Sequence, residues 1–231
     1  MVFSRIKIAL KKLMRSSDSV VEQGRSSKDI FGNIYHENYW GNEDSRSGAG
    51  SDLEQTVEVR KHLPGLFKEM GVQSILDIPC GDWHWMKDVD IDVIYTGADI
   101  VPEMIQRNKE SYESEWCHFD VLDMTRDQLP EVDLIFSRDV LVHLSYEDII
   151  AAISNMKSSG ATYLLTTTFI DRASNFDIPT GHWRPINLQK APFNFPAPIK
   201  IIDEKCTEGD GSWGDKSLAL WKLSDLPVGE S

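Results

Sequence analysis

The chain has 231 residues, and its 24 basic and 37 acidic side chains give it a formal net charge of −13. This length fits one α/β domain with a core of its own, and the negative charge opposes binding to nucleic acid. No apolar stretch reaches the roughly 18 to 20 residues of a membrane-spanning helix. The three cysteines, Cys80, Cys117 and Cys206, form neither a disulfide framework nor a zinc motif, so we expect a cytoplasmic protein without a metal site.

The first segment differs from the rest because residues 1–15 carry five cations and no acid. At about 100° per residue, the apolar side chains except Ile8 fall on one arc and the cations on the other, which predicts an amphipathic helix. With the polar linker that follows, this helix forms a predicted N-terminal segment, 1–28, ahead of one domain over 29–231. Peripheral contact with the anionic inner face of a membrane is one interpretation. Docking on the acidic body of the chain, a frayed end and a transit peptide are the alternatives.

Strand and helix patterns alternate through the domain. A capping box of Ser51 and Glu54 predicts a helix through about Met70 that ends at Gly71, with a bend at Pro64. The following alternation predicts an α/β fold with a mostly parallel sheet covered on both faces. Residues 199–206 and 216–223 flank a Gly/Asp-rich turn and predict an antiparallel hairpin at the end of the chain. The other expected strands are 74–78, 92–99, 117–122, 132–137 and 161–169, and the expected helices are 102–111 and 145–159.

Three acidic side chains stand at the ends of successive predicted strands, namely Asp77, Asp99 and Asp120. Ligands of open parallel sheets collect at the carboxyl ends of the strands. An acid at 99 is placed to accept hydrogen bonds from ribose hydroxyls, and an acid at 120 from an exocyclic amine such as that of adenine. Gly81, in the turn after the first strand, allows the backbone to approach a ligand closely. Each acid alone is explained as well by a strand end or a cap, but their joint spacing indicates a nucleoside site.

The turn ILDIPCGDW decides which nucleoside fits. A dinucleotide pyrophosphate needs several glycines whose amides surround the phosphates, whereas this turn has Pro79, Asp82 and Trp83. Carboxylates at 77 and 82 would repel phosphate and would attract a sulfonium and an ammonium group. S-adenosylmethionine (SAM) has both groups and no phosphate, so SAM is the predicted cofactor. Cys80 in the same turn is interpreted as a packing residue and not as a nucleophile.

These segments, followed by GADI, DVLD and DLIFSRDVLVHLS, resemble class I SAM-dependent methyltransferases. The closest resemblance, from about Tyr39 to Leu223, is to a PCGDW-type subgroup that often accompanies glycan assembly. It implies a Rossmann-like sheet of seven strands in the order 3-2-1-4-5-7-6. The usual glycine-rich loop keeps only Gly81 of its glycines here. The implied cofactor-binding set is Asp77, Pro79, Cys80, Gly81, Asp82, Asp99, Ile100, Asp120, Val121 and Arg138.

Candidate catalytic residues follow the fourth predicted strand, in the segment SRDVLVHLS. His143 lies four residues beyond Asp139, so the two share a face if the loop is helical. Either side chain is a candidate base for a hydroxyl acceptor. The alternatives are an Asp139 that caps a helix or pairs with Arg138, and a His143 that is packed against a carbonyl. A magnesium-assisted variant lacks a clear third ligand.

A long polar, proline-rich stretch, 171–198, follows the fifth predicted strand, and long loops in compact domains are usually functional. Trp183 is predicted to stack on a sugar ring, with Arg184 and Asn187 bonded to its hydroxyls. The alternative is that these residues only anchor the loop. Tyr39 and Trp40 are predicted to close over the cofactor as a lid, with Trp40 also in contact with the substrate, or else to pack an N-terminal helix.

The predicted function is SAM-dependent O-methylation of a sugar, a glycan or another small hydroxylated acceptor. N-methylation and methylation of another class of small molecule are the nearest alternatives. An NAD-type oxidoreductase is disfavoured by the missing pyrophosphate glycines, and a non-catalytic adaptor with this fold is a further alternative.

Overall fold

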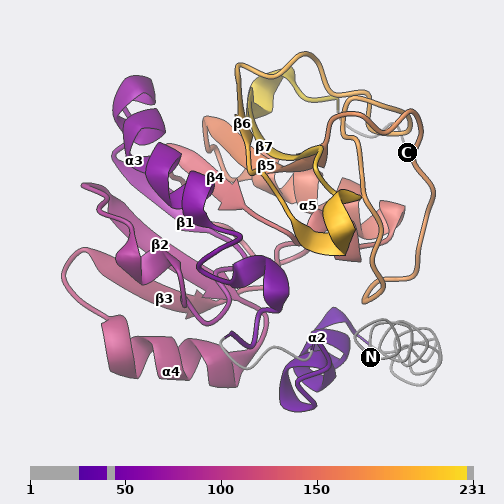
Figure 1. The fold of residues 1–231 in the computed structure, drawn as a ribbon. Coiled ribbons are helices and arrows are strands. Elements are labelled where there is room, and N and C mark those ends of the chain that lie inside the picture. Colours follow the sequence, from indigo (N-terminus) through magenta and orange to yellow (C-terminus); the bar gives the residue numbers. More distant parts are fainter. Residues whose placement is uncertain (1–25, 41–44, 228–231) are drawn as a thin grey trace.

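Figure 1 shows the computed structural model, which describes residues 26–40 and 45–227. Seven strands form one sheet in the order β3-β2-β1-β4-β5-β7-β6, so the predicted strand order is confirmed. Strands β1 to β5 pair in parallel, and β7 is antiparallel to both β5 and β6, which confirms the C-terminal hairpin. The strands are β1 Ser74–Asp77, β2 Ile94–Asp99, β3 Cys117–Val121, β4 Leu134–Ser137, β5 Tyr163–Phe169, β6 Lys200–Asp203 and β7 Lys216–Lys222.

The helices are α2 Ser27–His36, α3 Val57–Met70, α4 Pro102–Tyr112 and α5 Tyr146–Ser158. The predicted start of α3 was wrong. Ser51 ends a short 3-10 turn, Ala49–Ser51, and the extended backbone of Asp52 separates that turn from the helix. The helix begins only after Thr56, whose hydroxyl donates to the Asp52 carbonyl oxygen at 2.9 Å. Its predicted end is confirmed, because Gly71 takes the left-handed conformation at φ 66°.

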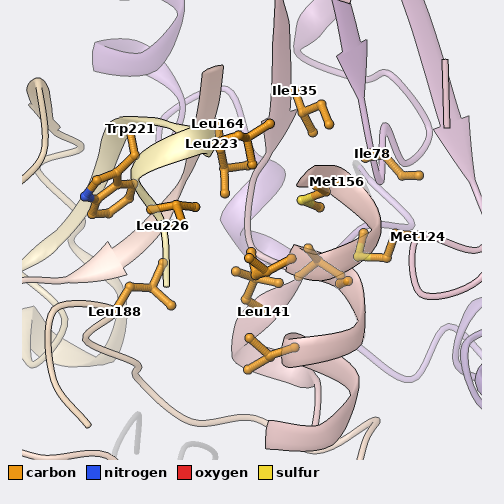
Figure 2. Packing of buried hydrophobic residues seen from close by; sticks show 14 of the residues in the cluster. Ile78, Met124, Ile135, Leu141, Met156, Leu164, Leu188, Trp221, Leu223 and Leu226 are labelled. Atoms are coloured by element: carbon orange, nitrogen blue, oxygen red, sulfur yellow. The ribbon is translucent and has the colours of Figure 1, made fainter. Parts of the chain in front are cut away.

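Two hydrophobic layers cover the two faces of the sheet. Successive residues of β4 point to opposite layers, with Ile135 in one and Leu134 and Phe136 in the other, as the two-residue period of a strand requires. One layer includes α5 and the end of β7, and Figure 2 shows its Met156 and Trp221. The other includes Leu63 and further buried residues of α3. Because both faces are covered, the site lies at the carboxyl edge of the strands.

The described chain begins with the N-cap of α2. Ser26 and Asp29 form a capping box there, so helical structure starts two residues before the predicted domain boundary at 29. The predicted basic helix, 1–15, lies outside the described residues. Within 26–40 and 45–227, no helix is both long and apolar enough to span a membrane.

Candidate active site

One cavity of about 540 Å³ lies at the carboxyl ends of β1, β2, β4 and β5. Its size is that of a pocket for a small ligand or cofactor. Residues of α2 and of the segment 45–51 close it on one side, and the connection between β6 and β7 contributes Glu208 and Trp213. The cavity therefore occupies the position where open α/β sheets bind ligands.

The turn after β1 is held from several directions. The Cys80 amide donates to the Ala98 carbonyl oxygen at 2.8 Å, and the Asn108 side chain donates to the Gly81 carbonyl oxygen at 2.8 Å. Gly81 has φ 57°, and a Cβ on it would overlap Oγ of Ser47. Glycine is thus required both by the backbone conformation and by the close approach of the 45–51 segment.

Asp82 fastens that segment to the turn. Its carboxylate accepts hydrogen bonds from Oγ of Ser45 at 3.0 Å and from the Arg46 amide at 2.8 Å. Asp82 does line the cavity, as predicted, but protein donors already occupy its oxygens. These contacts hold the segment 45–51, which we call the cover of the cavity, against the turn.

Two buried carboxylates face the cavity at the ends of β1 and β2. Asp77 is 3% exposed and accepts a hydrogen bond from the Tyr95 hydroxyl at 2.5 Å. Burial raises the pKa of Asp77 to about 8, although the Tyr95 hydrogen bond acts in the opposite direction. Burial also raises the pKa of Asp99 to about 6, against the backbone hydrogen bonds that it accepts from Val101 and Gly81.

Of the other predicted cofactor residues, Pro79, Cys80, Ile100 and Arg138 also line the cavity. Asp120 and Val121 do not line it. Both are exposed on the edge strand β3, and Asp120 accepts a hydrogen bond from the Val121 amide. The chain enters the cavity only after the strand has ended, with residues 122–125. The strand pattern identified the end of β3, but the direction of the following turn was not evident from it.

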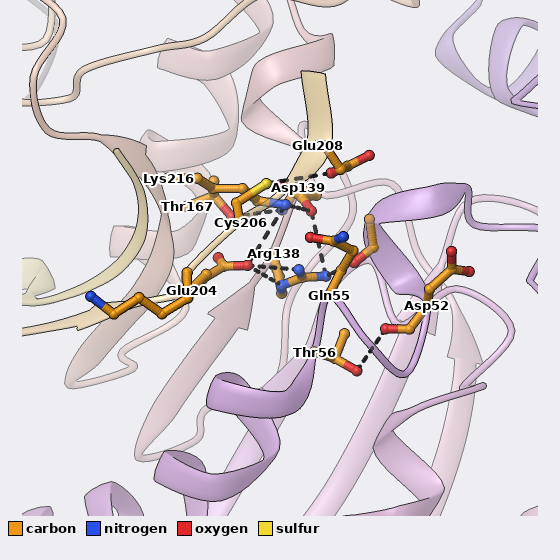
Figure 3. Close-up of polar contacts among 12 residues, drawn as sticks. Asp52, Gln55, Thr56, Arg138, Asp139, Thr167, Glu204, Cys206, Glu208 and Lys216 are labelled. Carbon is orange, nitrogen blue, oxygen red and sulfur yellow. Dashed lines mark hydrogen bonds and ion pairs between the residues drawn. The ribbon is translucent and has the colours of Figure 1, made fainter. Parts of the chain in front are cut away.

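Figure 3 shows an ionic cluster of four residues, the buried Arg138, Glu204 and Lys216 and the half-buried Asp139. All of them except Glu204 line the cavity. Arg138 donates to Oε2 of Glu204 at 2.7 Å, and Lys216 donates to Oδ2 of Asp139 at 2.5 Å. Burial alone would raise the pKa of Asp139, but Lys216 and Arg138 outweigh it and lower that pKa. A carboxylate held in this way is a weak base, which disfavours the predicted catalytic role of Asp139.

His143 ends the 3-10 turn Leu141–His143 and lines the same cavity. Its Nδ1 lies 2.8 Å from the His182 carbonyl oxygen. Burial lowers the pKa of His143, with partial opposition from this hydrogen bond and from Asp139. The ring is therefore neutral near pH 7. Trp40, which also lines the cavity, packs against it with a ring-centroid distance of 5.0 Å.

The predicted substrate residues of the 171–198 loop divide into two groups. Trp183 lines the cavity and is 41% exposed. Arg184 and Asn187 are buried and do not line it. Arg184 donates to the carbonyl oxygens of Leu141 and Leu144, and Asn187 donates to those of Ile170 and Arg172. These two side chains hold the loop on the domain, which was the alternative interpretation of the sequence.

Four further cavity residues were not singled out from the sequence: Phe169, Glu208, Trp213 and Lys216. Glu208 and Trp213 come from the hairpin connection, for which the sequence predicted only a turn, and Lys216 begins β7. The signal available was a tryptophan and several acids within a glycine-rich turn, EGDGSWGD. The pairing of β7 with β5 brings this distant connection to the cavity.

Residues 75–159, from β1 to the end of α5, match the family described as a methyltransferase domain. Human N-acetylserotonin methyltransferase in complex with SAM has a similar structure, with 15% identity and a TM-score of 0.58 over 93% of this chain and 66% of that chain. N-methyltransferase NodS from Bradyrhizobium japonicum WM9, in complex with S-adenosyl-L-homocysteine, has 18% identity and a TM-score of 0.57 over 82% and 98% of the two chains. No curated protein sequence matches this chain significantly.

The present chain thus spans 66% of the length of the human enzyme. At these identities, the structural likeness shows the fold, and the predicted Rossmann-like fold of class I methyltransferases is confirmed. The family match covers the part of the chain that carries the two buried acids and His143. Over those residues the chain matches a methyltransferase domain, in agreement with the predicted enzyme class.

Proposed function

We propose that this chain transfers a methyl group from SAM to a hydroxyl of a small, sugar-like acceptor, with His143 as the general base. The methyltransferase class and the cofactor are supported by the family match and by similar structures that contain SAM or its demethylated product. The acceptor class comes from the resemblance to the glycan-associated subgroup. The observation that carries the proposal is the position of the His143 imidazole, held by the His182 carbonyl oxygen within a cavity that Asp77 and Asp99 also line.

The cavity residues fit this cofactor. Asp77 and Asp99 are buried carboxylates. Gly81 has no side chain, which leaves room for Ser47 beside the turn. Acids in this position favour a cationic ligand over a phosphate. In the proposed arrangement, Asp99 holds the ribose hydroxyls, and Asp77 and the Gly81 turn hold the amino-acid end. SAM supplies a methyl carbon that its sulfonium already activates.

In the proposed reaction, the protein aligns the two reactants and accepts one proton. The acceptor oxygen would bond to the methyl carbon as the bond between that carbon and the SAM sulfur breaks and S-adenosyl-L-homocysteine leaves, and the acceptor's proton would pass to Nε2 of His143. Nδ1 keeps its hydrogen bond to the His182 carbonyl oxygen, which stabilises the imidazolium that results. Alignment in a closed cavity can contribute about 7 to 11 kcal/mol to such a displacement.

The test is transfer of labelled methyl groups from SAM to a panel of neutral sugars, glycolipids, hydroxylated aromatics and amines. A labelled saccharide or other hydroxyl product, lost in His143→Ala and retained in the matched control His118→Ala on β3, supports the proposal. Label only on amines would replace O-methylation by N-methylation. Calorimetry with SAM and NADH completes the test, because affinity for NADH alone indicates an oxidoreductase, and affinity for neither indicates an adaptor.

We also propose that residues 1–15 make peripheral contact with an anionic membrane surface on the cytoplasmic side. The five cations of this segment support the contact. Co-sedimentation of the full chain with vesicles containing phosphatidylserine tests it. Binding that disappears when the five cations are replaced by glutamine supports the contact. Equal sedimentation of both forms contradicts it.

A further inference from the structure

The cavity that contains His143 has an aromatic wall, which we define as Phe169, Trp183 and Trp213. All three residues line the cavity. The ring centroids of Trp183 and Trp213 are 4.6 Å apart, and the Phe169 ring packs edge-on against both, at 6.1 Å from Trp183 and 6.3 Å from Trp213. The wall joins the end of β5, the loop after it and the connection between β6 and β7.

The wall is fixed from behind. The Arg172 guanidinium lies over the rings of Phe169 and Trp213, at 5.7 Å and 5.4 Å from their centroids. The same guanidinium pairs with Asp215 and donates to the Ser212 carbonyl oxygen at 2.7 Å. Gly209 has φ 62°, and a Cβ on it would overlap the Trp213 indole. These contacts hold the Trp213 ring in one place before any ligand arrives.

Glu208 lines the same cavity and precedes Gly209, the residue that packs on the Trp213 indole. Its carboxylate accepts a weak contact from the Cys206 thiol at 3.7 Å. The neighbouring cations are already paired, since Lys216 contacts Asp139 and Arg138 contacts Glu204. In the part of the chain that the structure describes, Glu208 has no ion-pair partner. A half-buried carboxylate of this kind accepts hydrogen bonds from hydroxyl groups and repels a ligand with negative charge.

We propose that the aromatic wall and Glu208 form the acceptor subsite, and that it takes an uncharged, hydroxyl-bearing ring such as a saccharide. The inference rests on the proposed methyltransferase function and specifies its acceptor. The Trp183 and Trp213 rings are inclined at 63° to each other, so the apolar face of the acceptor ring stacks on the half-exposed Trp183 and its edge meets Trp213. A hydroxyl of the acceptor donates to Glu208. The subsite selects against acceptors that carry a carboxylate or phosphate. Arg184 and Asn187, which the sequence suggested as acceptor contacts, are not part of this subsite, because their side chains donate to backbone carbonyl oxygens.

Quenching of tryptophan fluorescence tests the subsite with the full chain saturated with S-adenosyl-L-homocysteine. The probes are neutral methyl glycosides of several sugars and the uronate form of each. We expect saturable quenching by at least one neutral glycoside and binding of its uronate at least about tenfold weaker. Trp213→Ala and Trp183→Ala are each expected to weaken binding of the neutral glycoside about tenfold. Glu208→Gln is expected to reduce the discrimination between the two probe forms to less than about threefold.

Trp116→Ala and Asp210→Asn are the matched controls. Trp116 is 63% exposed, Asp210 is in the same turn as Glu208, and neither lines the cavity. Quenching by no neutral glycoside, equal binding of the uronates, or unchanged binding in both tryptophan variants would overturn the subsite. Calorimetry with SAM separates this failure from failure of the proposed function. SAM affinity without glycoside binding removes only the subsite, whereas absence of SAM affinity removes the function.

Discussion

Nδ1 of His143 lies 2.8 Å from the carbonyl oxygen of His182, and the Gly181 amide donates in return to the His143 carbonyl oxygen at 2.8 Å. Because a carbonyl oxygen only accepts, the proton of the neutral ring resides on Nδ1. Nε2 is therefore left as a hydrogen-bond acceptor. The loop after β5 thus decides which nitrogen of a residue that follows β4 can take a proton.

The rate of methyl transfer should fall at acidic pH because His143 becomes protonated. Burial lowers the pKa of His143 from its ordinary value, so the neutral base is favoured at neutral pH and is lost as the pH falls through the lowered pKa. With the acceptor found by the transfer assay, His143→Gln should reduce kcat by about 10² to 10⁴ and abolish the acidic limb. Measurement of kcat at saturating SAM between about pH 5 and pH 9 tests this. An acidic limb that persists in the variant would return His143 to a packing role.

SAM binding should release a proton near pH 7. Asp77 has a pKa of about 8 in the free protein, so it is mostly protonated there, and a bound cationic ligand favours its ionised form. Calorimetry in two buffers of different ionisation enthalpy should detect about one released proton. In Asp77→Asn, the affinity should fall and this release should disappear. Identical heats in both buffers for the unmodified chain would contradict the assignment.

Gly81→Ala should weaken SAM binding at least about tenfold. A side chain at φ 57° costs on the order of 1 to 3 kcal/mol, and its Cβ would displace Ser47 from the cover of the cavity. Ser47→Gly in the same chain should restore part of the affinity, because it removes the overlap but not the backbone strain. Gly65→Ala is the control, since a Cβ there meets open space. Unchanged SAM affinity in Gly81→Ala would show that the turn does not contact the cofactor.

Arg184→Lys should lower stability and kcat while SAM affinity stays the same. Arg184 donates to the carbonyl oxygens of Leu141, Leu144 and Phe176, and a lysine cannot reach all three. We expect a loss of about 2 to 4 kcal/mol in the free energy of unfolding, with displacement of the His143 turn. Urea unfolding and steady-state kinetics test this, with the exposed Arg126→Lys as control. A raised KM at unchanged stability would instead support direct contact with the acceptor.

The strands and their order followed from the sequence because each depends on a local pattern or on the resemblance that those patterns carry. The end of α3 at Gly71 is also local, since one residue with φ 66° ends the helix. Its start was mistaken because Ser51 and Glu54 have the spacing of a capping box. The extended backbone at Asp52, beside a segment bound to Asp82, is set by tertiary contacts.

The same distinction holds for the site. The sequence by itself determined the α/β alternation, the acids that end β1 and β2, and the candidate base after β4, because the carboxyl ends of parallel strands lie at one edge of the sheet. Only the tertiary structure decided which polar side chains face the cavity. It turned Arg184 toward backbone carbonyls, left Asp120 on an exposed edge strand and brought Trp213 into the cavity that contains His143. Such choices depend on how segments far apart in the chain pack and satisfy each other's buried polar groups, which no local pattern records.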